Sequence, residues 1–158
     1  MKRHRIVQLL ATGGIGGAQG SVTDLAAALD PSRFAVEAVF LTDGPAVGGM
    51  RGRGIPTTVL NEPDDRIAVR MLAEHLRERE TDLLHAHMYR AELLGARAAR
   101  LAGTPAVIGT VHSSRIRSEA DVTALAAVTP LMDHLVAPSA FIADKIRREG
   151  RGATPISI

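Results

Sequence analysis

Residues 6–17 read IVQLLATGGIGG, and this stretch decides the fold. The apolar run over 6–10 predicts a buried β-strand, and the four glycines within 13–17 predict a tight turn directly after it. A helix is expected from about Ala18, because apolar residues then recur with the i, i+3, i+4, i+7 spacing of one buried face. The residues on that face are Val22, Leu25, Ala26 and Leu29.

The same alternation continues along the rest of the 158 residues. Apolar runs predict strands over 6–10, 36–41, 57–60, 83–86, 106–111, 134–137 and, as a seventh candidate, 156–158. Further helical stripes are carried by Met71, Leu72 and Leu76, by Ala91, Leu94, Ala98 and Leu101, and by Ile142 and Ile146 after an N-cap at Ser139. A short helix is expected within 44–54, a loop over 113–120, and the end of the last helix near Gly150.

Strands that are apolar on both faces are typical of a parallel sheet covered by helices on both sides. The pattern therefore predicts an α/β protein, a Rossmann-like three-layer domain whose parallel sheet has about six to seven strands joined by right-handed crossovers. Its length predicts one domain over residues 1–158. Aromatic residues make up only 3%, so the core is expected to consist of Ala, Val, Leu and Ile.

The sequence contains no cysteine, which excludes disulfides and thiolate metal sites. The apolar run behind the basic start covers only residues 6–11 before Gly13 and Gly14 follow, which is too short for a signal-peptide core or a membrane span. A cytoplasmic protein is expected.

The net charge is +2 and the pI is about 9.7. A solvated arginine-rich surface explains this excess, and an anionic partner such as a phospholipid surface is the alternative. In that alternative the protein is peripheral at the inner face of the membrane, with Arg51, Arg53, Arg115 and Arg117 as the contact residues. Nucleic acid is not an expected partner, because aromatic residues are few and no binding motif is present.

Three features follow strands and should therefore meet at the carboxyl edge of the sheet, where open parallel sheets bind ligands. They are the glycine turn, residues 85–88 after the fourth strand, and residues 112–114 after the fifth strand. In the turn, glycine permits positive φ and close approach of a ligand, and the helix start offers free N–H groups to an anion such as phosphate. Gln19 stands where a dinucleotide fingerprint has its third glycine, which argues against a nicotinamide site. A tight turn without a ligand is the alternative.

Two histidines at the fourth strand, His85 and His87, should lie on one face of the sheet because side chains alternate. We expect His85 to be structural and His87, further out, to contact a ligand. No metal is expected, because a third ligand at a suitable spacing is missing. His112 ends the fifth strand, where a neutral imidazole can bond a hydroxyl or transfer a proton. A capped core histidine is the alternative for His112.

Basic side chains flank the expected cleft at Arg90, Arg115 and Arg117, and a guanidinium fork suits phosphate. A solvated surface is the alternative for each arginine. Asp64 and Asp65 precede a helical pattern and are interpreted as helix caps.

Taken together, several motifs resemble the N-terminal half of a GT-B glycosyltransferase of the large retaining family 4, the group 1 type. The order and spacing of the motifs carry the resemblance, which spans nearly the whole chain. They are GGIGGAQ at 13–19, LAAALDPSRF at 25–34, GIP at 54–56, DLLHAH at 82–87, TVHS at 110–113 and PS at 138–139.

The resemblance implies transfer of a sugar from a nucleotide-diphosphate-sugar to an acceptor, either lipid-linked or a glycan, without a cofactor or metal. In that family the N-terminal domain mainly holds the acceptor and a C-terminal domain holds the donor. By position, His112 would contact the transferred sugar as the catalytic residue and His87 would lie toward the acceptor. The other residues assigned to substrate or donor are Gly14, Ile15, Gly16, Gly17, Arg90, Ser113 and Arg115.

Two departures qualify the resemblance. Many members have Glu at the position of Gln19, which puts any charge-dependent role there in doubt. The chain also ends at Ile158, about where the first half should cross to a donor-binding domain. We therefore expect an acceptor-side half that is inactive alone, and the alternative is a standalone module that binds a phosphorylated ligand without catalysis.

Overall fold

Strands and α-helices alternate along the chain in the computed structural model, which describes residues 2–158. The predicted domain over 1–158 includes Met1, which lies outside the described residues. The strands are β1 (His4–Leu10), β2 (Phe34–Phe40), β3 (Thr57–Val59), β4 (Leu83–His87), β5 (Ala106–Thr110), β6 (His134–Val136) and β7 (Ile156–Ser157). The helices are α1 (Gly17–Ala28), α2 (Pro45–Gly52), α3 (Asp65–Glu78), α4 (Tyr89–Ala102), α5 (Glu119–Val128) and α6 (Ala140–Arg148), with a 3₁₀ turn η1 (Thr129–Leu131) after α5.

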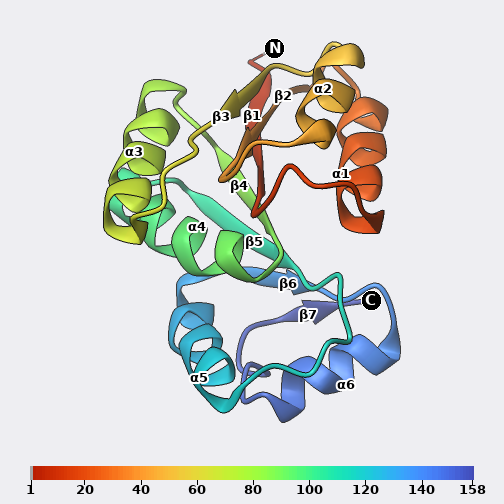
Figure 1. Cartoon of the computed structure of the whole chain (residues 1–158), viewed down its shortest axis with the longest axis vertical. Helices are drawn as coiled ribbons and strands as arrows, with labels where there is room; N and C mark the ends of the chain where they lie inside the picture. The colour runs from red at the N-terminus through yellow and green to blue at the C-terminus, as the bar shows by residue number, and fades with distance from the viewer. Residues whose placement is uncertain (1) are drawn as a thin grey trace.

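All seven described strands pair in parallel, in the order β3-β2-β1-β4-β5-β6-β7 (Figure 1). The chain builds outward from β1 to β3, then returns to pair β4 with the other side of β1. The strand order therefore reverses between β1 and β4, which is the point where ligands bind in open α/β sheets. The predicted α/β class and parallel sheet are confirmed.

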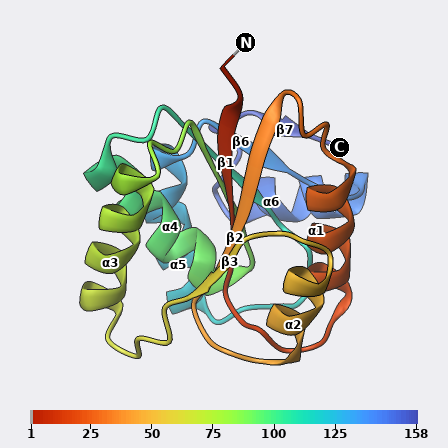
Figure 2. The same cartoon turned by 90° about the horizontal axis from the view of Figure 1, so that it is seen from above.

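Helices cover both faces of the sheet (Figure 2). On one face, Leu10 and Phe40 pack with Val22 of α1 and Met50 of α2. We call this the α1 face. On the other, here called the α4 face, the neighbouring residues Leu9 and Ala86 belong to a larger apolar cluster with side chains of α3, α4, α5 and α6. Because neighbours in a parallel register share a face, the two clusters separate the sheet into a three-layer arrangement.

Three residues of the predicted helical stripes are exposed rather than buried: Leu25, Met71 and Leu101. In α1 the buried face is instead made by Gln19, Val22 and Ala26. Successive helical residues are about 100° apart, so Leu25 lies at the margin of the face that these three share. The apolar spacing found the helices, while their packing set the rotation of each one.

Helix caps follow the predicted pattern at α3 and α6. The Asp64 carboxylate accepts hydrogen bonds from the backbone N–H groups of Arg66 and Ile67, at 2.8 and 3.1 Å. The Ser139 hydroxyl accepts from Ile142 N at 3.3 Å, and Gly150 beyond the end of α6 has a φ of +74°. The short helix predicted within 44–54 is α2.

Helix α5 was not predicted, and its start at Glu119 shortens the loop expected over 113–120. The Ser118 hydroxyl caps it by accepting from Asp121 N at 3.2 Å. Only Leu125 and Val128 are buried in this alanine-rich helix, so the sequence shows no long apolar stripe there. Strand β1 begins at His4, before the apolar run, because its backbone pairing with β2 continues where the side chains are exposed.

Candidate active site at the carboxyl edge of the sheet

The residues predicted to form a site leave adjacent strands at the carboxyl edge of the sheet. The glycine turn follows β1, Met88 follows β4 and His112 follows β5, and these strands are neighbours in the order β1-β4-β5. Gln19 of α1 reaches across to the β4 segment, where its Nε2 donates to Met88 Sδ at 3.9 Å. The turn and the histidines therefore border the same part of the edge.

Gly13 is required by a close crossing of two backbone segments. Its N–H donates to the Thr42 carbonyl at 3.0 Å, and its carbonyl accepts from Ala46 N at 2.9 Å. A Cβ added at Gly13 would lie 2.6 Å from Gly44 N, too close for any side chain. This part of the turn is determined by packing against the loop between β2 and α2.

The glycines of the turn do not adopt the positive φ that glycine permits. The positive-φ glycines of the described chain lie elsewhere, at Gly54, Gly103 and Gly150, and Gly16 is extended with a φ of −178°. A Cβ at Gly17 would meet no atom within 4 Å. The absence of side chains there leaves open space in front of the helix start, and Ile15 at the tip is almost fully exposed.

Gln19 ties the helix start to the turn. It is buried, and its Nε2 donates to the Thr12 carbonyl at 3.1 Å. A Cβ at Gly16 would lie 2.8 Å from Gln19 Oε1, so the missing side chain at Gly16 makes room for the amide. A carboxylate at position 19 could not donate to Thr12, so this chain uses the position for a neutral hydrogen bond. The first N–H groups of α1 receive no side-chain cap.

The histidines form a chain of short contacts from the sheet interior toward the edge. His87 Nε2 lies 2.7 Å from Gln8 Oε1, and His87 Nδ1 lies 2.9 Å from His112 Nε2. His85 stands apart from this chain, with its Nε2 2.7 Å from the Thr110 hydroxyl, although the rings of His85 and His87 are only 3.9 Å apart. The two β4 histidines share the α1 face, as the alternation predicted.

His87 does not lie further out than His85. Its relative exposure is 1%, against 7% for His85, and both of its ring nitrogens have partners. The reason is that β4 continues through residue 87, so this histidine is still inside the sheet. His112, one residue beyond the buried Val111, is the partly exposed member of the hydrogen-bonded series that joins Gln8, His87 and His112.

Burial keeps all three histidines neutral. Desolvation, followed by the nearby His112, lowers the pKa of His85 to about 4. Desolvation also lowers the pKa of His87 well below its usual value, with further contributions from His85 and His112, and lowers the pKa of His112. A neutral imidazole carries one N–H and one lone pair, so each ring can pass a hydrogen bond from one side to the other.

The predicted arginines are arranged unequally. Arg90 binds the start of α3, where its Nε donates to Asp65 at 2.9 Å and its Nη2 donates to the Glu62 carbonyl at 2.9 Å. Arg115 is exposed, and its N–H donates to the Ser113 hydroxyl at 3.0 Å, which orders the loop after β5. The Arg117 guanidinium lies 4.6 Å from the centre of the Tyr89 ring. Ser113 and Arg115 are thus near His112 in the chain, while Arg90 is engaged beside α3.

The four arginines proposed for a membrane-facing surface do not lie at the same edge of the sheet. Arg115 and Arg117 follow β5 at the carboxyl edge. Arg51 and Arg53 lie at the end of α2, where Arg51 Nη2 donates to the carbonyl of Thr57 at the start of β3. The end of α2 is therefore at the opposite, amino edge of the sheet. Arg53 is also paired with Asp24 at 3.2 Å.

Within residues 2–158, no cluster of three or more histidine and acidic side chains has a geometry that could hold a metal ion. Over the same residues, no helix combines the length and apolar character that crossing a membrane requires.

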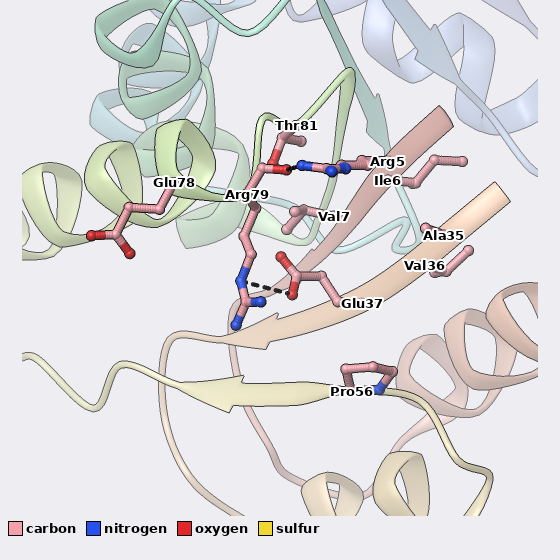
Figure 3. A pocket seen from close by; sticks show the side chains of 10 residues that line it. All are labelled: Arg5, Ile6, Val7, Ala35, Val36, Glu37, Pro56, Glu78, Arg79 and Thr81. Carbon is pink, nitrogen blue, oxygen red and sulfur yellow. Dashed lines mark hydrogen bonds and ion pairs between the residues drawn. The ribbon is translucent and has the colours of Figure 1, made fainter. Parts of the chain in front are cut away.

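A separate cavity of about 310 Å³ lies at the amino edge, against β1 and β2 (Figure 3). Glu37 and Arg79 form an ion pair across it at 3.6 Å, and the buried Thr81 hydroxyl lacks a partner there. None of the residues predicted for the site lines this cavity. Of its charged groups, Glu37 pairs with Arg79 and Arg5 pairs with Glu80, whereas the imidazole of His112 is partly exposed.

Two buried polar groupings were missed by the sequence analysis. Gln8 interrupts the apolar run of β1, and that interruption was a signal that could have identified it. Glu92 of α4 pairs with Arg151 beyond α6, and Arg151 Nε also donates to the Thr129 hydroxyl at 2.8 Å. These residues are far apart in the sequence, so only the folded chain brings them together.

The sheet order, the glycine turn and the histidines at the carboxyl edge define a Rossmann-like domain of the GT-B type, as found in the N-terminal half of GT-B enzymes. The chain belongs to Glycosyltransferase Family 4, whose sequence profile matches residues 15–158.

Solved structures show the same fold at low sequence identity. Anabaena Alr3699/HepE, in complex with UDP and glucose, superposes with a TM-score of 0.83 at 20% identity, over 98% of this chain and 44% of that protein. The lipopolysaccharide outer core galactosyltransferase WaaB in its apo form gives 0.74 at 16% identity, over 98% and 44%. A UDP-N-acetylglucosamine 2-epimerase gives 0.73 at 15% identity, over 99% and 48%. This chain thus spans less than half of each of these proteins. No curated protein sequence matches it.

Proposed function

We propose that this chain is the acceptor-side half of a retaining glycosyltransferase that moves a sugar from a nucleotide-diphosphate-sugar to an acceptor. Family membership supports a transferase, and the nucleotide-sugar is supported by the UDP and glucose bound to HepE. The observation that carries the proposal is the partly exposed, neutral His112, which lies at the same carboxyl edge of the sheet as the uncapped start of α1.

His112 is proposed to contact a hydroxyl of the transferred sugar. Its Nε2 is engaged with His87, so Nδ1 is the ring nitrogen that remains for a substrate. Because burial lowers the pKa of His112, the imidazole is neutral at pH 7 and can accept a hydrogen bond there. A partly buried site strengthens such a bond relative to one in water.

The glycine turn is proposed to face the donor diphosphate or the reacting sugar through Gly14, Ile15, Gly16 and Gly17. The open space at Gly17 and the unpaired N–H groups of the first turn of α1 support this assignment. Fixed N–H dipoles stabilise negative charge that develops on a leaving diphosphate without a metal. Ser113 and Arg115 on the loop after β5 are proposed to bind substrate. Arg90 is proposed to support the edge through α3. A direct acceptor contact by His87 would require its hydrogen bonds to open.

Catalysis is proposed to need a donor-binding domain in addition to this chain. GT-B neighbours are more than twice as long as the region that superposes on it. The acceptor is proposed to be lipid-linked or a glycan, and any membrane contact to involve the carboxyl edge near Arg115 and Arg117.

The test is donor turnover, measured as UDP release from UDP-glucose by this chain joined to a donor-binding domain. We expect His112→Ala to lower kcat/KM about 100-fold, a typical contribution of one positioned proton-transfer or hydrogen-bonding group. His134→Ala is the matched control, because His134 bonds Ser157 elsewhere on the sheet. Turnover at the unsubstituted rate in His112→Ala would remove the assignment.

The isolated chain is the second arm of this experiment. We expect it to release no UDP and to bind UDP weakly in calorimetry, because the donor site is proposed to lie on the other half. Tight UDP binding without turnover would instead support a standalone module that binds a phosphorylated ligand.

A further inference from the structure

A buried hydrogen-bonded chain connects Gln8 to His112 through His87. Gln8 is on β1 and His87 on β4, and both are 1% exposed. In the register of these strands Gln8 neighbours His85 and Leu10 neighbours His87, so Gln8 and His87 both face the α1 face. Gln8 is therefore close enough to bond His87. It is buried within the sheet, away from the carboxyl edge where a ligand would bind.

The direction of the hydrogen bonds follows from the chemistry of the groups. Gln8 Oε1 can only accept, so the nitrogen that it contacts, His87 Nε2, carries the proton. A neutral His87 then has its lone pair on Nδ1, which accepts from His112 Nε2–H. The lone pair of His112 must consequently be on Nδ1.

We propose that Gln8 is a positioning residue that fixes, through His87, the tautomer in which His112 presents the Nδ1 lone pair to a substrate hydroxyl. The inference rests on the proposed function, because it assumes that His112 meets the sugar. An imidazole that presented N–H instead would donate to the hydroxyl and could not take its proton. Gln8 thus selects which of these two roles is available to His112.

The chain of contacts also explains why polar residues occupy the interior of β1 and β4. A buried N–H group without a hydrogen-bond acceptor costs free energy that a hydrogen-bonded one does not. His87 therefore keeps its proton on Nε2 only while Gln8 Oε1 accepts a hydrogen bond from it. Replacing Gln8 by an apolar residue should make His87 move its proton to Nδ1 and donate to His112 Nε2. His112 would then carry its own proton on Nδ1.

The test is imidazole ¹⁵N–¹H correlation NMR on the 158-residue chain, at about pH 8 so that any histidine with an ordinary pKa is also neutral. In the unsubstituted chain we expect His112 to be protonated on Nε2. In Gln8→Leu we expect the proton of His112 to move mainly to Nδ1. Protonation on Nδ1 in the unsubstituted chain, or on Nε2 in folded Gln8→Leu, would overturn the proposal.

Two further variants separate positioning from general damage to the core. Gln8→Glu keeps an acceptor for His87 Nε2–H, so His112 should stay protonated on Nε2, and a reversed tautomer would contradict the proposal. Thr110→Val removes the partner of the neighbouring His85 and should leave the His112 tautomer unchanged. A reversal in Thr110→Val would show that the tautomer responds to any disturbance of this face, and it too would overturn the proposal.

Donor turnover separates this inference from the proposed function. In the two-domain protein we expect Gln8→Leu to lower UDP release about 10-fold or more, with Gln8→Glu and Thr110→Val close to the unsubstituted rate. If His112→Ala lowers turnover but Gln8→Leu leaves both tautomer and rate unchanged, only the role of Gln8 is wrong. If His112→Ala has no effect while the tautomer still reverses in Gln8→Leu, the proposed function is wrong and the control of tautomer by Gln8 stands.

Discussion

Two buried polar clusters lie on opposite faces of the sheet and differ in charge. On the α1 face, the neutral cluster consists of Gln8, His85, His87, Thr110 and His112. On the α4 face, the charged cluster consists of Glu92, Arg151 and Thr129. Glu92 belongs to the α4 face because it packs beside Gly109, where an added Cβ would lie 3.7 Å from its Cγ.

The difference separates a structural group from a chemically available one. Glu92 and Arg151 are almost completely buried, and each is the partner of the other. Burying a charge costs free energy unless it is paired, so losing either residue would leave an unpaired buried charge on the other. The neutral cluster carries no such cost, and it ends at His112, which is partly exposed. We infer that the charged cluster holds α4 against the segment after α6, while the neutral cluster reaches the candidate site through Gln8, His87 and His112 alone.

The largest expected effect comes from removing one member of the charged cluster. Arg151→Met should lower the free energy of unfolding by about 4 kcal/mol, because it leaves the Glu92 carboxyl buried without its partner. Urea denaturation at pH 7 followed by circular dichroism measures the change.

The double variant Glu92→Met with Arg151→Met is the control for that prediction. It removes both charges, so most of the lost stability should return and the two substitutions should be strongly non-additive. Additive losses would show that the pair is not coupled, and the distinction between the two clusters would fail.

Acidification should lower the free energy of unfolding through the neutral cluster and raise it through Glu92. The folded pKa of His85 is about 4, below the ordinary value of 6.5, because burial disfavours the charged ring. Its stabilising contribution is therefore complete above pH 6.5 and is lost as the pH falls toward 4, since the unfolded chain binds the proton first. The loss from His85 alone is about 3 kcal/mol. Burial raises the pKa of Glu92, so its protonation opposes this loss.

Unfolding free energies measured between pH 7 and pH 4 for the unsubstituted chain and for His85→Asn test the assignment. The substitution should flatten the decline, because the remaining slope then comes from the other groups. Parallel curves for the two proteins would mean that His85 is not the residue that titrates.

The smallest expected effect comes from removing one hydrogen bond within the neutral cluster. Thr110→Val keeps the side-chain shape but removes the hydroxyl that bonds His85 Nε2. We expect a loss of about 1 kcal/mol, because only a neutral ring nitrogen is left without a partner. The same urea titration measures it, and a loss as large as that of Arg151→Met would erase the contrast between the clusters.

Local sequence patterns predicted the sheet, most helices and several caps, because those features depend on residues close together in the chain. The apolar run of β1, the capping residue Asp64 and Gly150 beyond α6 are examples. Helix α5 was not predicted, because an alanine-rich segment buries few large side chains and shows little periodicity. The rotation of α1 about its axis was not predicted either, since it depends on how the helix packs against β1 and β2.

The sequence predicted which edge of the sheet carries the candidate site, but not how the side chains of the site contact one another. Strand ends placed the glycine turn, residue 87 and His112 at the same part of the sheet, because the carboxyl ends of parallel strands share an edge. The burial of His87 and its contact with Gln8 depend on the register between β1 and β4. A spacing pattern within one strand cannot supply that register.

The sequence by itself determined that the chain alternates strands and helices, that its sheet is parallel, and that its glycine turn follows the first strand. Only the tertiary structure decided that Gly13 serves a backbone crossing, that Glu92 meets Arg151, and that Gln8 reaches His112 through His87. The physical reason is the range of the forces involved. Periodicity and capping act over a few residues. The buried hydrogen bonds and ion pairs join side chains 25 to 79 positions apart, and they form only when the strands and helices have packed together.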